Sequence, residues 1–164
     1  MRELAKLLAD DGYSAPPAHI LEGLSQELAH RCPPGAPHSI YAELWHIVFW
    51  QEISLRWIAG KTVNYPEHSS QGFPTANDVA STPWSELHRQ FFTGLEHAAQ
   101  LAVDDAQLGR RIMCTSRPGH PVRYMSVLEQ LENLAAHNAY HLGRIVLLRQ
   151  LLASWPPPSG GDRW

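Results

Sequence analysis

The sequence predicts an all-α protein, a four-helix bundle with long crossover connections. Apolar residues recur at helical spacing in four long segments, two long segments rich in proline and glycine separate them, and little of the chain alternates as a strand would. The four predicted helices cover residues 16–31, 38–59, 83–102 and 124–154. Connections of this length favour a bundle with crossovers over one built from simple hairpins.

The first two predicted helices begin at recognisable signals. Residues 1–12 are compatible with a short amphipathic helix, and Pro16 and Pro17 fit the first turn of the next helix. The helix over 38–59 is apolar nearly all round and stops at Gly60. Such a helix is buried on most sides, or is buried on one side and packs against a partner on another, so a homodimer through helices is an alternative.

The later part of the chain contains one long loop, a small hairpin and the last helix. Residues 61–83 carry three prolines without periodicity, and loops of this length often line a site. The segments 110–115 and 121–125 are compatible with a hairpin. Ser126, followed three residues later by Glu129, has the form of a capping box at the start of the last helix.

Length and composition limit the organisation and the function classes. The 164 residues, 44% hydrophobic and 18% charged, predict one bundle domain over 1–154 and a flexible Pro/Gly-rich tail over 155–164. A net charge of -3 argues against nucleic-acid binding. No signal peptide or membrane span is expected, and Cys32 and Cys114 form no CxxC pair, so a cytoplasmic protein is the default prediction.

Two histidines interrupt the apolar face of the last predicted helix. His137 and His141 are four residues apart, so they project from one face, and that face continues through residues expected in the core. Two buried imidazoles need partners for their ring nitrogens, and a divalent metal ion would provide them. Chance occurrence in a chain with ten histidines is the alternative. A zincin-type protease is disfavoured because residue 138 is Asn rather than Glu.

A metal site needs a further ligand, and His46 is the best candidate. It lies in the middle of the helix over 38–59, on a stripe with Trp50 and Trp57. A lone histidine on an apolar face is more often a core residue than a ligand. Two facing helices of a bundle would nevertheless bring His46, His137 and His141 together. Asn133, one turn before His137, is a candidate hydrogen-bond partner for its ring.

The motif HNAYHLGRI, residues 137–145, and the stretch ELWHIVFWQE around His46 resemble the DinB-like superfamily, which includes the YfiT-type proteins. Members are four-helix bundles with one metal-binding histidine in the second helix and H-x-x-Y-H-x-G-Q-I in the last. Tyr140, Gly143 and Ile145 match that motif, whereas Arg144 stands where the family often has Gln. The resemblance implies a metal site formed by His46, His137 and His141.

The resemblance also implies a range of functions. Related families include S-transferases and isomerases that use low-molecular-weight thiols such as bacillithiol or mycothiol, so the first hypothesis is a metal-dependent thiol S-transferase. The alternatives are a hydrolase that uses metal-bound hydroxide, and a non-enzymatic, stress-related metal-binding bundle. Three histidines favour one divalent transition metal ion, with zinc or nickel first.

The charged residues of the sequence separate these hypotheses poorly, although each reaction would need different groups around a small-molecule substrate. A hydrolase would favour a carboxylate near the metal, and Glu43 and Glu132 are candidates, although both are expected at the surface or beside a ligand. A thiol cofactor would need basic or polar groups. Those available near the crossover loops are Arg89, Arg111, Arg117 and Arg123.

Overall fold

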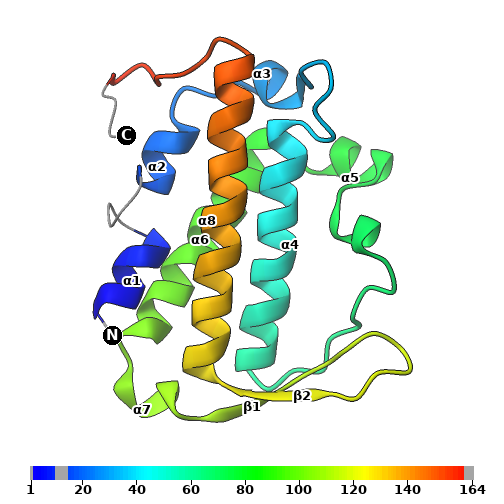
Figure 1. The fold of residues 1–164 in the computed structure, drawn as a ribbon, viewed down its shortest axis with the longest axis vertical. Helices are drawn as coiled ribbons and strands as arrows, with labels where there is room; N and C mark the ends of the chain where they lie inside the picture. Colours follow the sequence, from blue (N-terminus) through cyan, green and yellow to red (C-terminus); the bar gives the residue numbers. More distant parts are fainter. Residues whose placement is uncertain (1, 10–14, 161–164) are drawn as a thin grey trace.

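Three long helices run side by side and form most of the molecule in the computed structural model, which describes residues 2–9 and 15–160 (Figure 1). Helix α4 packs against both α8 and α6. The helices are α1 (Arg2–Ala9), α2 (Pro17–Leu21), α3 (Gln26–His30), α4 (Ile40–Ile58), η1 (Ser69–Gly72), α5 (Ala76–Ser81), α6 (Trp84–Ala102), α7 (Asp105–Leu108) and α8 (Val127–Leu151), and the strands are β1 (Arg111–Cys114) and β2 (Arg123–Ser126). The predicted all-α fold is confirmed.

The predicted helix over 16–31 is wrong, because this segment forms the two short helices α2 and α3. Gly23, at φ +68, places a left-handed residue between them. The chain then restarts at Ser25, whose side chain accepts a hydrogen bond from the Leu28 amide at 3.1 Å. The fourth position of the bundle is therefore occupied by short helices, with α1 packed on α6 and α8 and α2 packed on α8.

The other three predicted helices correspond to α4, α6 and α8. Helix α4 begins after Ser39, whose side chain accepts from the Ala42 amide at 3.2 Å, and Gly60 follows it at φ +74. The capping box of Ser126 and Glu129 is present at the start of α8. That helix ends at Leu151, three residues earlier than predicted. Strong local periodicity and capping explain why these helices were predictable.

The predicted hairpin is also present. Strands β1 and β2 pair in antiparallel register from Arg111 opposite Ser126 to Cys114 opposite Arg123. The hairpin lies at one end of the bundle and leads directly into α8 (Figure 1). The long connection over 61–83 contains η1 and α5 rather than irregular chain alone, and η1 packs against α4. The connection therefore brings backbone groups next to the middle of the bundle.

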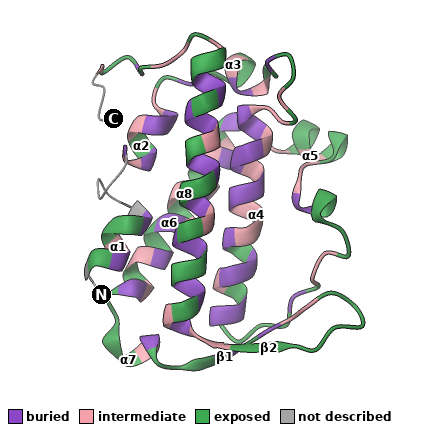
Figure 2. Ribbon diagram, in the orientation of Figure 1, coloured by how far each residue is buried: buried purple, intermediate pink, exposed green. Residues whose placement is uncertain are grey.

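The core lies between α4, α6 and α8 (Figure 2). Helix α4 is buried on most sides, as its sequence predicted, and only Glu52 and Arg56 are exposed along it. A homodimer stays a prediction. On α8, the stripe that carries the two histidines is buried at Val127, Leu131, Leu134, Ile145 and Leu148. Among the described residues, no helix is long and apolar enough to cross a membrane.

The segment after α8 turns back onto α2. The Ser159 amide donates to Glu22 Oε1 at 3.0 Å, and Pro158 lies against Gly23. Buried Arg149 donates to the carbonyl oxygens of Ile20 and Ser154. Of the predicted tail over 155–164, Pro158 and Ser159 thus contact the residues directly after α2, and residues 161–164 lie outside the described part of the chain.

Candidate metal centre

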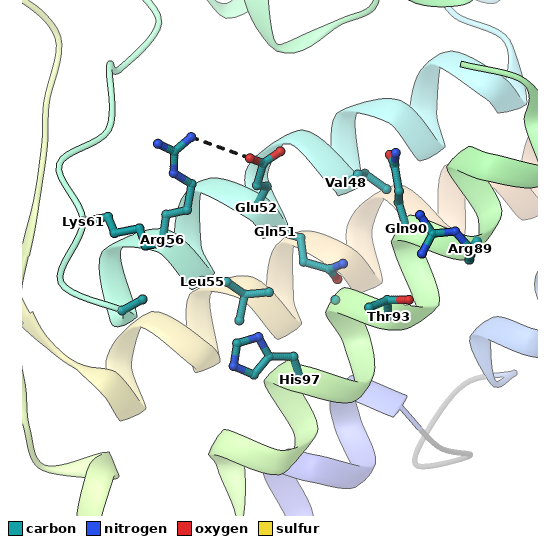
Figure 3. Close-up of a pocket in the computed structure, with 12 residues that line it drawn as sticks. Val48, Gln51, Glu52, Leu55, Arg56, Lys61, Arg89, Gln90, Thr93 and His97 are labelled. Atoms are coloured by element: carbon teal, nitrogen blue, oxygen red, sulfur yellow. Dashed lines mark ion pairs between the residues drawn. The ribbon is translucent and has the colours of Figure 1, made fainter. Parts of the chain in front are cut away.

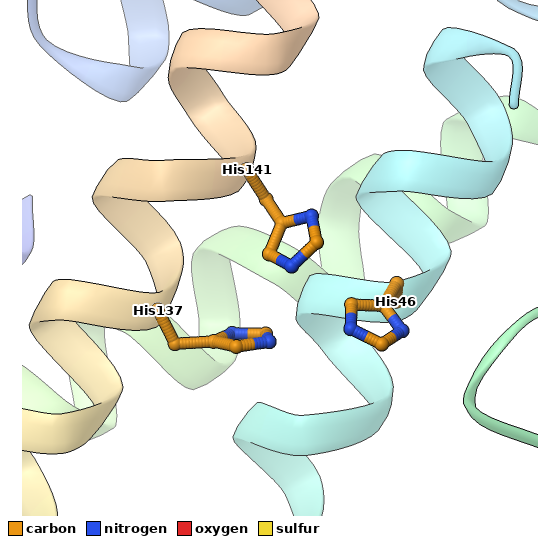
Figure 4. A group of neighbouring side chains, drawn as sticks. All are labelled: His46, His137 and His141. Carbon is orange, nitrogen blue, oxygen red and sulfur yellow. The ribbon is translucent and has the colours of Figure 1, made fainter. Parts of the chain in front are cut away.

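Two neighbouring helices bring three histidines together in the middle of the bundle. Figure 4 shows His46 on α4 facing His137 and His141 on α8. One ligand nitrogen from each ring lies within 4.8 Å of the others. The ring centroids are 4.5 Å apart for His46 and His141, 4.5 Å for His137 and His141, and 5.1 Å for His46 and His137. This group could hold a metal ion.

The long connection orients the His46 ring. The ring Nδ1 donates to the Gly72 carbonyl oxygen at 3.0 Å, which leaves Nε2 available as a ligand. Phe73 stacks on the same ring with centroids 4.3 Å apart. A Cβ atom at Gly72 would lie 3.1 Å from His46 Nδ1 and 3.2 Å from Trp50 Nε1, so a glycine permits this close approach.

A buried carboxylate orients the His141 ring. His141 Nδ1 donates to Glu43 Oε2 at 2.7 Å, and Glu43 is 0% exposed. Arg144 donates to the other carboxylate oxygen, Oε1, from Nε at 3.0 Å and lies 2.7 Å from it through Nη2. A carboxylate that accepts from a histidine N–H fixes its tautomer and leaves the opposite nitrogen for a metal.

This carboxylate is held in its charged form. Burial acts to raise the pKa of Glu43, but the hydrogen bond from His141 and the positive charge of Arg144 outweigh burial, so its pKa lies below the usual range. Both of its oxygens are engaged by these two partners. Glu43 therefore orients the His141 ring and balances the positive charge of Arg144. Neither of its oxygens is free to act as a general base.

The His137 ring, unlike the other two, is not held at Nδ1 by a hydrogen bond to any described residue. Its Nδ1 is buried and has no hydrogen-bond partner among the described residues. Burial and the neighbouring rings of His141 and His46 lower the pKa of His137 to about 4, and burial also lowers the pKa of His46. Neutral imidazoles are the form that binds metals, and an unpaired buried nitrogen costs free energy. The donor set therefore fits a transition metal ion.

Three imidazoles form an open site, because no fourth ligand joins them among the residues that the structure describes. Such a donor set suits zinc, nickel, copper, cobalt or iron, and it leaves coordination positions for water or substrate. The group includes no cysteine and no carboxylate.

A pocket of about 560 Å³ opens beside the three histidines. Trp50, Trp57 and Tyr65 give it an aromatic wall. Its polar lining includes Ser54, fixed by a 2.9 Å hydrogen bond from Gln130, and Arg123 of β2. No aspartate or glutamate is among the lining residues. The pocket has the size and the mixed lining of a small-molecule site.

The structure shows where the other predicted site residues lie. Asn133 lines the pocket, but its amide contacts Met125 Sδ at 3.9 Å, so the predicted bond to the His137 ring is wrong. Glu132 is exposed, and Arg144 forms the inter-helix contact with Glu43. Of the four candidate arginines, Arg123 lines this pocket, whereas Arg89, Arg111 and Arg117 do not.

The role of Glu43 was not predictable with the same certainty as the ligands. Its only sequence signal is a position three residues before His46, which puts both on neighbouring parts of one face of α4. Gly72 carried no signal beyond its place in a long loop. Tyr140, next to His141 in sequence, is 62% exposed, and its hydroxyl accepts from Arg144 at 3.3 Å.

Replacing Glu43 by glutamine is expected to lower metal affinity about 10- to 100-fold, because the variant loses the negative charge that supports the His141 ring. Competition with a chromophoric chelator measures the affinity of each variant for zinc. Glu52→Gln is the control, since Glu52 is an exposed residue of the same helix paired with Arg56. Equal affinities for the two variants would contradict the role given to Glu43.

Comparison with known proteins places this arrangement in a family. No curated protein matches the chain. A family model described as the DinB superfamily matches residues 4–145, which include α4, the loop that bears Gly72 and both histidines of α8. This match covers well over half of the 164 residues. The chain belongs to the DinB superfamily.

Proposed function

We propose that this protein is a metal-dependent enzyme of the thiol S-transferase type. The observation that carries the proposal is an open group of three histidines in the wall of a 560 Å³ pocket whose lining includes no carboxylate. A low-molecular-weight thiol would be one substrate and a small electrophile the other. A divalent ion bound by the three rings would act as a Lewis acid and lower the pKa of a bound thiol.

The residues around the histidines support distinct parts of this reaction. The aromatic wall of Trp50, Trp57 and Tyr65 would exclude water and pack against an apolar electrophile. Arg123, Gln130 and Asn133 offer N–H donors to the polar and anionic groups of a thiol cofactor. The thiol sulfur would form a bond to an electrophilic carbon, and the leaving group would depart with the bonding electrons and take up the thiol proton.

The carboxylates favour thiol transfer over hydrolysis. A metal-dependent hydrolase commonly uses a carboxylate as general base beside the attacking water. Glu43, the nearest carboxylate, is bonded to His141 and Arg144 and does not line the pocket. Thiol transfer needs no such base, because a thiol is far more acidic than water.

The first experiment combines metal analysis with a thiol screen. We expect about one transition metal ion per chain in protein purified without a histidine tag. The metal-loaded protein is then assayed with bacillithiol, mycothiol and glutathione against monochlorobimane, and separately with ester substrates. Metal-dependent conjugation with one thiol supports the proposal. Ester hydrolysis without conjugation would replace it with the hydrolase, and metal binding without either activity would support a non-enzymatic bundle.

Arg123→Gln is expected to raise the KM for an anionic thiol about fivefold and to leave kcat unchanged, because Arg123 lines the pocket as an exposed charge. Steady-state kinetics with the thiol varied measure the effect. Arg117→Gln is the matched control, since Arg117 is an exposed residue of the same hairpin that does not line the pocket. A fall in kcat with unchanged KM would assign Arg123 a different role.

A further inference from the structure

A second cavity lies on the opposite side of α4 from the histidines. It has a volume of about 510 Å³ and is formed by α4 and α6 (Figure 3). Val48 and Leu55 of α4 and Ala59, directly after this helix, give it an apolar surface, and Gly94 of α6 lies opposite them. None of the three histidines lines it. The cavity is therefore separate from the candidate metal centre and is large enough for a small organic molecule.

A buried amide lines this cavity. Gln51 is 2% exposed, and its Nε2 donates to the Phe91 carbonyl oxygen at 3.0 Å. This bond fixes the orientation of the amide, because the opposite orientation would place two oxygens together. Its Oε1 accepts no hydrogen bond from any residue that the structure describes. A buried oxygen of this kind needs a donor, and a ligand N–H or O–H group would supply one when the Gln51 side chain shifts toward the cavity.

Gly94 makes the position of this amide possible. A Cβ atom at Gly94 would collide with Gln51 Nε2 and would lie 2.8 Å from its Cδ. The Gln51 amide thus occupies the space that the side chain of any residue other than glycine would fill at position 94. Gln51 is held at the boundary between the two helices, where Figure 3 shows it between Leu55 and Thr93.

Basic side chains border the cavity. Arg56 and Lys61 lie toward one end in Figure 3 and Arg89 toward the other, and Glu52 is the single carboxylate among the lining residues. Arg56 pairs with Glu52 at 3.6 Å, and Arg89 pairs with Glu86 at 2.6 Å. Lys61 forms no ion pair within the described part of the chain. The border therefore has a positive charge available for an anion.

We propose that this cavity binds a small organic acid with an apolar body and a hydrogen-bond donor. The apolar body would cover Val48 and Leu55, the donor would face Gln51 Oε1, and the carboxylate would lie near Lys61. The site is independent of the metal and of the proposed S-transferase activity. Its ligand class follows from three separate features, which are the apolar surface, the unpaired acceptor and the unpaired cation.

The test uses three probes that differ in one group each, on the full chain. N-Hexanoylglycine has the apolar chain, the N–H donor and the carboxylate; N-hexanoylsarcosine lacks the donor, and the glycine methyl ester lacks the charge. Calorimetry is expected to give a dissociation constant of about 1 mM or lower for the first probe. Each of the other two should bind about fivefold more weakly. A dissociation constant for N-hexanoylglycine well above about 1 mM would overturn the proposal.

Variants locate the bound probe. Thr93→Trp fills the cavity from an exposed position of α6 and should weaken binding at least tenfold, whereas Gln100→Trp, exposed on the same helix and outside the cavity, should not. Lys61→Gln should weaken binding of the acid about threefold, with Lys6→Gln as its control. Gln51→Leu should remove the preference for N-hexanoylglycine over the sarcosine analogue. Binding unaffected by Thr93→Trp would overturn the assignment.

Amide resonances distinguish the two cavities. In proton–nitrogen correlation spectra, N-hexanoylglycine should shift the Gly94 amide and the side-chain amide of Gln51, equally in metal-free and zinc-loaded protein. Shifts confined to His137 and Tyr140 would place the probe in the pocket beside the histidines and overturn the proposal. Because this readout does not depend on metal or thiol chemistry, its failure is distinguishable from failure of the proposed function.

Discussion

Replacing His46, His137 or His141 by alanine is expected to abolish stoichiometric metal binding, with a loss in affinity of more than about a hundredfold for each variant. The loss should exceed that expected for Glu43→Gln, because each substitution removes a ligand and not merely the hydrogen-bond partner of one. Elemental analysis of the purified chain measures the metal content, and chelator competition measures the affinity for zinc.

The fold should survive these substitutions, because the bundle core does not depend on the three rings. Leu131, Leu134 and Ile145 surround the histidines on α8 and stay in place. His97→Ala, an exposed histidine of α6, is the control and should keep its metal content. Retention of one metal ion per chain in a folded His137→Ala or His141→Ala protein would show that these residues are core histidines.

The metal-free protein is expected to lose about 3 kcal/mol of stability between pH 6.5 and pH 4 through His137 alone. The pKa of this residue is 6.5 in the unfolded chain and about 4 in the folded one, mainly because of burial. Between these values the unfolded state binds more protons, so the free energy of unfolding is highest above pH 6.5 and falls as the pH falls. Urea titrations in the presence of a chelator measure it.

His137→Gln isolates this contribution, because the variant keeps a polar side chain that does not titrate. Its free energy of unfolding should depend less on pH between 6.5 and 4 by about the same 3 kcal/mol. His97→Gln serves as the exposed control and should follow the wild-type curve. Glu43 acts in a lower range, since its pKa is below the usual value and its stabilisation is lost only as that carboxylate is protonated. If the free energy of unfolding depended on pH in the same way in the wild type and in His137→Gln, the role given to His137 would be excluded.

The fate of the predicted helix over 16–31 shows where local patterns are insufficient. Ile20, Leu21, Leu24 and Leu28 have helical spacing, yet Gly23 at φ +68 separates α2 from α3. Pro158, from the other end of the chain, lies so close to Gly23 that a side chain there would collide with it. The break depends on a contact between distant segments, which apolar periodicity does not contain.

The environment of the histidines depends on distant segments in the same way. Glu43 is 98 residues from His141 and 101 from Arg144 in sequence, and only the packing of α4 on α8 brings the three together. Gly72 reaches His46 because the connection after α4 folds back along that helix. Neither contact follows from residue type or spacing, since each requires the relative position of two elements.

The sequence alone determined the three long helices and the shared face of His137 and His141, because both follow from the 3.6-residue period of a helix. It also indicated His46 as their partner, since a bundle places facing helices side by side. The tertiary structure decided which nitrogen of His46 and of His141 is hydrogen-bonded, which carboxylate orients a ligand, and where the two cavities open. These features depend on how α4 is positioned between α6 and α8, and that position is fixed by packing over the whole core rather than by any local pattern.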